Sequence, residues 1–150
     1  MRLSGLLSEE TITLNLTRSD KKGVIEELLN LAMKTGKVSD RSAALKSVLD
    51  REELMSTGLE KGVAVPHAKT STADGLTMAL GVSKEGIDFN SADGKPSHLF
   101  FFLLAPESEA GRNVQVLAQI ARLTNDSRFC DSLRQARSPE DALDIIRNAE

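Results

Sequence analysis

The sequence predicts an α/β fold in which a mixed β-sheet is flanked by helices on both faces. Segments with strand periodicity alternate with segments of helical periodicity, and turn-forming clusters separate them. Residues 99–104 (Leu-Phe-Phe-Phe-Leu-Leu) are apolar at every position, which is typical of a central strand covered on both faces. The length of 150 residues is enough for one domain with a substantial core, so we assign residues 1–150 to a single domain.

The other predicted strands are shorter and less apolar. Residues 11–16 alternate polar and apolar side chains, which is the period of a half-buried strand. Residues 63–65 (Val-Ala-Val) are predicted to be a strand that Pro66 ends, because proline has no N–H to give to a sheet ladder. Residues 76–83 are a further predicted strand, and the Lys-Glu-Gly sequence at 84–86 predicts a turn after it.

Apolar residues at helical spacing predict five helices. They lie near 20–35, near 40–55, at 113–124, in a short segment that ends at 133, and from 139 onward. Gly36 is suited to end the first helix, and Ser39 is the predicted N-cap of the second. Asp126 is the predicted N-cap of the short helix. Ser138 followed by Pro139 predicts the start of the last helix, with a cap and then a proline at the first helical position.

Composition excludes several classes of protein. The net charge is −3 without a basic stripe, and Trp and Tyr are absent, so we expect no nucleic-acid partner. No apolar run is long enough to span a membrane, and the N-terminal apolar segment is too short for a signal peptide, which predicts a cytoplasmic protein. The single cysteine, Cys130, excludes an internal disulfide and is predicted to pack in a helix. With two histidines and no tight ligand spacing, we expect no metal site.

The stretch from Arg51 to Ala68 contains the candidate functional residues. His67 follows a predicted strand and Pro66, and loops at strand ends often carry titratable functional side chains. From the residue types alone, a structural or surface histidine is the more common interpretation of this position. Arg51 lies at the predicted end of a helix beside two glutamates, where a solvated helix end is the simplest interpretation. The Ser-Thr-Gly sequence at 56–58 is common in turns.

This stretch resembles the signature of the fructose/mannitol-type EIIA domains (EIIA type 2) of the bacterial phosphotransferase system, and most closely the nitrogen-regulatory, PtsN-like EIIA proteins. The resemblance rests on Arg51-Glu52, on Ser56-Thr57-Gly58, on Gly62, and on Ala64-Val65-Pro66-His67-Ala68, and it extends more loosely over nearly the whole chain. It implies a small α/β/α sandwich, which agrees with the fold class predicted from periodicity.

The resemblance also implies roles for individual residues. His67 would accept a phosphoryl group on Nε2, and Arg51 would hold phosphoryl oxygens with its planar fork. The side chains of Ser56 and Thr57 are further candidate donors in the phosphoryl pocket. Members of the family commonly carry a second histidine where this chain has Asn113. An amide can donate a hydrogen bond to a phosphoryl oxygen but cannot take a positive charge, so transfer could be slower here.

Several functional alternatives stay open at this point. The resemblance implies an HPr-like or NPr-like phosphocarrier protein as donor, no cofactor, and either an EIIB domain or a regulatory target protein as partner. A nitrogen-regulatory role is favoured over a sugar-specific EIIA, and a regulatory interaction module with impaired transfer is the third alternative. The other histidine, His98, matches neither histidine position of the family pattern, and we expect it to be a residue at a strand edge.

Overall fold

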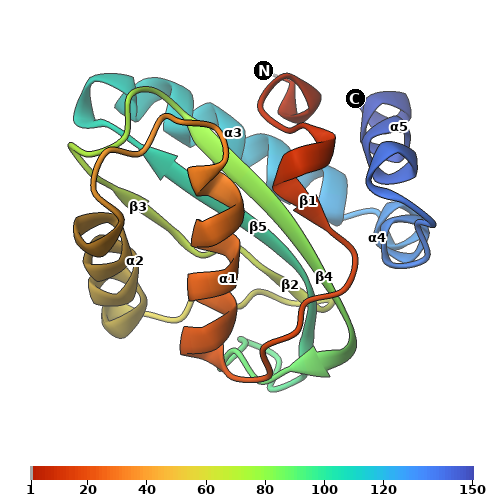
Figure 1. The fold of residues 1–150 in the computed structure, drawn as a ribbon. Coiled ribbons are helices and arrows are strands. Elements are labelled where there is room, and N and C mark those ends of the chain that lie inside the picture. The colour runs from red at the N-terminus through yellow and green to blue at the C-terminus, as the bar shows by residue number, and fades with distance from the viewer. Residues whose placement is uncertain (1) are drawn as a thin grey trace.

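A mixed five-stranded sheet forms the centre of the protein (Figure 1). The computed structural model describes residues 2–150. The strands are β1 (Ile12–Thr13), β2 (Val63–Ala64), β3 (His67–Lys69), β4 (Thr77–Ile87) and β5 (Ser97–Ala105). Their order is β1-β4-β5-β2, and β3 pairs with the second half of β5. Only the β4–β5 pair is antiparallel, so the predicted mixed sheet is confirmed.

Helices cover both faces of the sheet, as predicted. The helices α1 (Lys21–Met33) and α2 (Arg41–Leu54) lie on one face, and α3 (Ala110–Thr124), α4 (Ser127–Arg134) and α5 (Pro139–Ala149) lie on the other (Figure 1). Alternate side chains of β5 enter the two cores: Leu99, Phe101 and Leu103 pack toward α3–α5, whereas Phe100, Phe102 and Leu104 pack toward α1 and α2. The all-apolar run is therefore a central strand buried on both faces. None of the helices within residues 2–150 is both long and apolar enough to cross a membrane.

Two predicted strand boundaries were wrong. The strand predicted at 11–16 is reduced to β1, because Thr11 closes a 3-10 turn by donating its backbone N–H to Ser8. The turn predicted at 84–86 lies inside β4, which continues to Ile87 with an irregular register after Val82. Gly86 has a φ of 88°, which permits this bulge.

The helix boundaries agree better with the sequence. Asp40, not Ser39, caps α2, since the Asp40 carboxylate accepts the N–H of Ala43. The start of α5 is confirmed, with the Ser138 hydroxyl accepting the N–H of Asp141. The helix predicted from Asn113 begins earlier, at Ala110, after a 3-10 turn at 107–109.

Candidate functional site

His67 follows the end of β2, as the sequence suggested, and it also begins a further short strand, β3, that the sequence did not predict. Pro66 separates β2 from β3, and both strands run parallel to the same partner, β5. The carbonyl of Pro66 accepts the N–H of Leu103, and His67 then pairs with Leu103 as the first residue of β3. The backbone on both sides of the histidine is therefore fixed by pairing with the buried central strand.

A backbone contact fixes the tautomer of the His67 ring. Nδ1 lies 2.6 Å from the carbonyl oxygen of Val65. A carbonyl only accepts hydrogen bonds, so Nδ1 carries the proton and the neutral ring has its lone pair on Nε2. The pKa of His67 is lowered from its usual 6.5, mainly because the ring is partly buried. The hydrogen bond to Val65 and the charge of Glu52 act in the opposite direction, and the charge of Arg51 lowers the pKa further. The ring is neutral at pH 7 and able to act as a nucleophile.

The His67 ring is accordingly expected to titrate with a midpoint below pH 6.5. The unfolded chain then takes up the proton at higher pH than the folded protein. The stability contributed by neutral His67 is fully present above about pH 6.5 and decreases as the pH falls below that value. An NMR titration of the His67 ring protons measures the midpoint, and a midpoint above 6.5 would show that burial does not control this ring.

His67 lines a cleft of about 520 Å³ together with Arg51 and Asn113. These three residues come from β3, α2 and α3, so three separate segments meet at one place. The guanidinium of Arg51 donates to the carbonyl of Met55 at 2.9 Å. Asn113 is 5% exposed, and it lines the cleft from α3. The structure thus brings together the three residues that the sequence singled out most strongly.

Lys69 also lines the cleft, and the sequence analysis missed it. Its ammonium lies 3.8 Å from the carboxylate of Glu107 and remains half-exposed. Residues at i and i+2 of a strand point to the same side, so Lys69 follows His67 on one face of β3. Recognising 67–69 as a strand would have identified this second cation.

Ser56 and Thr57 have a different role from the one expected. The Ser56 hydroxyl donates to the carbonyl of Phe89 at 2.6 Å, and the Thr57 hydroxyl donates to the carboxylate of Glu52. Thr57 is only 4% exposed. In this structure both hydroxyls donate within the loop after α2, so neither points its hydrogen toward the cleft.

Glu52 is buried, which contradicts the interpretation of this segment as a solvated helix end. Its carboxylate accepts the backbone N–H and the hydroxyl of Thr57 and pairs with Lys21 at 2.8 Å. The Lys21 ammonium in turn lies 4.9 Å from the centre of the Phe89 ring. This network holds the end of α2, and so Arg51, against the loop that leads to β2.

The cleft meets the chemical requirements for accepting an anionic group. Its lining includes one neutral imidazole protonated on Nδ1, an arginine, a lysine and a neutral amide, and its one carboxylate, that of Asp50, pairs with Lys46. Arginine and lysine balance the charge of an anion, and the amide can donate to an oxygen. An exposed apolar side chain also lines the cleft, that of Leu54, which is 83% exposed. The next residue, Met55, is 71% exposed.

Residues 5–149 match the family model described as phosphoenolpyruvate-dependent sugar phosphotransferase system, EIIA 2. The chain is 36% identical over 146 residues to the "PTS system fructose-specific EIIABC component" of Bacillus subtilis, covering 97% of this chain and 23% of that longer protein. It is 36% identical over 144 residues to the "PTS system fructose-specific EIIA component" of Haloferax volcanii, covering 96% of this chain and 94% of the relative.

A solved structure agrees with the sequence relatives. The crystal structure of the nitrogen regulatory protein IIA-Ntr from Neisseria meningitidis has a TM-score of 0.89 at 30% identity, covering 96% of this chain and 98% of that one. The α/β/α sandwich and the family resemblance are therefore confirmed. EIIA components are phosphotransfer proteins, in agreement with the chemistry of the cleft. The chain belongs to the EIIA type 2 family of the phosphoenolpyruvate-dependent sugar phosphotransferase system.

Proposed function

We propose that His67 accepts a phosphoryl group on Nε2 from an HPr-like or NPr-like carrier protein. The lone pair of Nε2 attacks phosphorus, and the bond between phosphorus and the donor's nitrogen breaks as the new P–N bond forms. The observation that carries this proposal is the Nδ1–H contact with Val65, because it leaves Nε2 as the nucleophilic nitrogen of a neutral ring.

The surroundings of His67 suit the charge that develops during this transfer. Negative charge spreads over the three outer oxygens of the phosphoryl group, and catalysis depends on positioning and on charge stabilisation. Arg51 can hold two of these oxygens with its fork, and Lys69 adds a point charge. Asn113 supplies a neutral donor from α3.

The apolar rim of the cleft favours a protein as the donor. Leu54 lines the cleft and is 83% exposed, and the residues that follow Leu54 and Asn113 in the chain, Met55 and Val114, are 71% and 65% exposed. Exposed apolar side chains around a reactive centre are typical of a surface that a protein partner covers. A small phosphorylated donor would leave these side chains in water.

Two downstream roles have support. A nitrogen-regulatory role, in which phosphate on His67 changes the charge of a protein surface, is favoured by the close structural match to IIA-Ntr. A sugar-specific role, in which His67 passes phosphate to an EIIB domain, is favoured by 36% identity to two fructose-specific relatives. The EIIABC relative is much longer than this chain, which matches only 23% of its length. The likeness therefore supports the sugar-specific role for the matched part of that relative alone.

The test is reconstitution with phosphoenolpyruvate, enzyme I and purified HPr-like or NPr-like carriers, followed by intact mass. One added phosphoryl group that depends on the carrier supports the proposal, and no gain with any carrier contradicts it. Adding a fructose-type EIIB to the phosphorylated protein separates the two roles. Rapid loss of phosphate to EIIB supports the sugar-specific role, and retention of phosphate supports the regulatory one.

Asn113→Ala is expected to slow phosphoryl acceptance by about ten- to a hundredfold. The amide of Asn113 lines the cleft and can donate to an oxygen there, and a hydrogen bond to a charged group contributes roughly 1.5–3 kcal/mol. Quench-flow measurement of the acceptance rate checks this expectation. Asn113→His is expected to equal or exceed the parent rate, since it restores the common family pattern. A full parent rate in Asn113→Ala would reduce Asn113 to a structural residue of α3 and leave Arg51 and Lys69 as the stabilising groups.

A further inference from the structure

A second hollow, of about 590 Å³, lies at the other end of β5 from His67. We call it the basic hollow, and its charged and titratable lining residues are Glu60, Lys61, Asp93, Lys95, His98 and Arg134. His98 is near the start of β5, whereas His67 pairs with Leu103. Five residues of extended chain separate these positions, or roughly 16 Å. The basic hollow is therefore separate from the cleft around His67.

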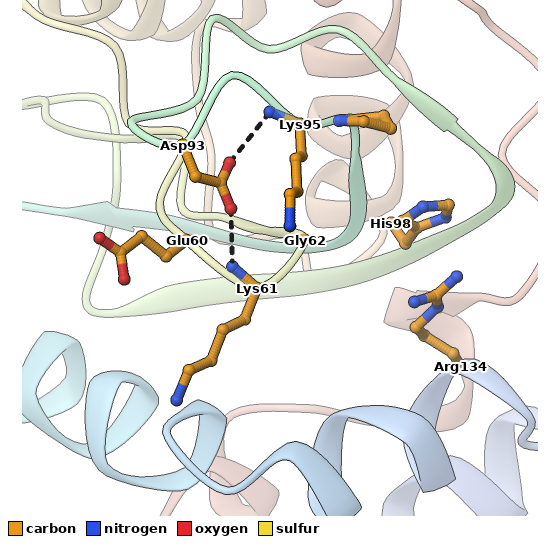
Figure 2. Close-up of a pocket in the computed structure, with 8 residues that line it drawn as sticks. Glu60, Lys61, Gly62, Asp93, Lys95, His98 and Arg134 are labelled. Atoms are coloured by element: carbon orange, nitrogen blue, oxygen red, sulfur yellow. Dashed lines mark hydrogen bonds between the residues drawn. The ribbon is translucent and has the colours of Figure 1, made fainter.

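Two cations of the basic hollow are free to meet a ligand. Within residues 2–150, neither Lys95 nor Arg134 forms an ion pair or donates a side-chain hydrogen bond. Figure 2 shows Arg134 reaching from α4 toward His98, and Lys95 extending from the loop before β5 into the same space. The third cation, Lys61, is occupied, because its ammonium donates to the backbone and side-chain oxygens of Asn125.

The two acidic residues make no ion pair with these cations within residues 2–150. The carboxylate of Asp93 accepts the backbone N–H groups of Lys61 and Lys95, at 3.3 and 3.0 Å, and so serves to hold the two loops together. Glu60 points away from the space between Lys95 and Arg134 (Figure 2). Three cations and two carboxylates line the basic hollow, which gives it a net charge of +1, although the whole chain has a net charge of −3.

The His98 ring is held in a defined orientation within this hollow. Its Nδ1 lies 2.9 Å from the carbonyl of Ser83 and donates to it, which leaves Nε2 as the ring nitrogen without a fixed role. The ring lies close to Gly62 and Gly86, where added Cβ atoms would lie 3.4 and 2.9 Å from ring carbons. The absence of side chains at these two glycines makes room for the imidazole, so its placement is built into the fold.

We propose that the basic hollow binds a small phosphate monoester. An arginine fork and a lysine point charge are the two side chains that recognise phosphate, and an oriented imidazole adds a third polar group. The volume is within the range of small-molecule sites. The loops of Lys61 and Lys95 and the ring of His98 are already held by hydrogen bonds, so binding an anion costs little conformational entropy there. This site requires no phosphorylation of His67 and does not depend on the role proposed for that residue.

The test is a titration of the full chain with glycerol 3-phosphate, followed by ¹H–¹⁵N NMR at constant ionic strength and without any phosphoryl donor. We expect saturable shifts at the amides of Lys61, Gly62, Lys95 and His98. Lys95→Gln and Arg134→Gln are each expected to weaken binding by about tenfold, because each removes a charge-assisted contact. The His67→Ala variant is expected to bind as the parent does, which separates this site from the proposed phosphoryl transfer.

Arg128→Gln is the matched control. Arg128 is on α4 like Arg134, its side chain is 92% exposed, and it lies outside the hollow. The same loss of charge there is expected to leave binding unchanged. Equal weakening in Arg128→Gln, shifts centred on His67 and Asn113, an identical response to glycerol with sodium acetate, or no saturable shifts at all would each overturn the proposal.

Discussion

The His67→Ala variant is expected to gain no phosphoryl group under conditions in which the parent protein is fully phosphorylated. The free Nε2 of His67 is the only neutral imidazole nitrogen that the structure places beside both Arg51 and Asn113. Without it, the donor's phosphoryl group meets no nucleophile in the cleft. Intact mass measures the gain, and phosphate on a ring nitrogen is identified by loss of the added mass in acid and its retention in base.

His98→Ala is the control for this experiment because the two histidines have the same tautomer. Both rings donate from Nδ1 to a backbone carbonyl, of Val65 in one case and of Ser83 in the other. They differ in position, since only His67 lies in the cleft with the apolar rim that suits a carrier protein. His98→Ala should accept phosphate as the parent does. Label that persists in His67→Ala but disappears in His98→Ala would reverse the assignment.

Glu52→Ala is expected to lower the free energy of unfolding by about 3 kcal/mol. The change leaves two buried groups of Thr57, the backbone N–H and the hydroxyl, without their acceptor, and each unpaired group costs about 1–3 kcal/mol. Loss of the Lys21 ion pair adds less, because Lys21 is a quarter exposed and can turn to water. The melting temperature should fall by about 6–12 °C in a protein of this size.

Glu53→Ala is the matched control for Glu52→Ala. Glu53 is the next residue of α2, carries the same charge and is exposed, so its removal should change the stability by less than about 0.5 kcal/mol. Thermal and urea unfolding measure both variants. If the two variants unfold alike, the buried network of Glu52 contributes no net stability, and the orientation of Arg51 must depend on other contacts.

The sequence predicts those parts of the fold that depend on local patterns. The six apolar residues at 99–104 identify the central strand without reference to any other segment. The start of α5 could also be predicted, because Ser138 caps the helix and Pro139 fits its first position, and both effects depend only on neighbouring residues. In contrast, β3 has three residues, and it is a strand because β5 offers it a parallel partner. The periodicity of a three-residue segment cannot predict that it pairs with a strand more than thirty residues away.

The same distinction applies to the candidate site. The motif that contains Arg51 and His67 predicted two residues that meet in the cleft, and the family pattern predicted the position of Asn113. The burial of Glu52 was missed because its ion-pair partner, Lys21, belongs to another helix. Hydroxyl groups such as that of Ser56 bind whichever carbonyl the fold presents, and here it is that of Phe89, from a remote loop.

The loop that follows α2 also affects how the protein avoids self-association. The β2–β3 side is an edge of the sheet, and β1 is the other edge. Long unpaired edges are templates for strand addition by a second chain, and natural proteins counter this with very short edge strands and with proline. Both edges here are short, and the outer side of β2 is already occupied: Leu59 donates its backbone N–H to the carbonyl of Val63, and Val65 donates its N–H to the carbonyl of Thr57. The loop after α2 thereby covers the edge next to a strongly apolar central strand and disfavours edge-to-edge aggregation.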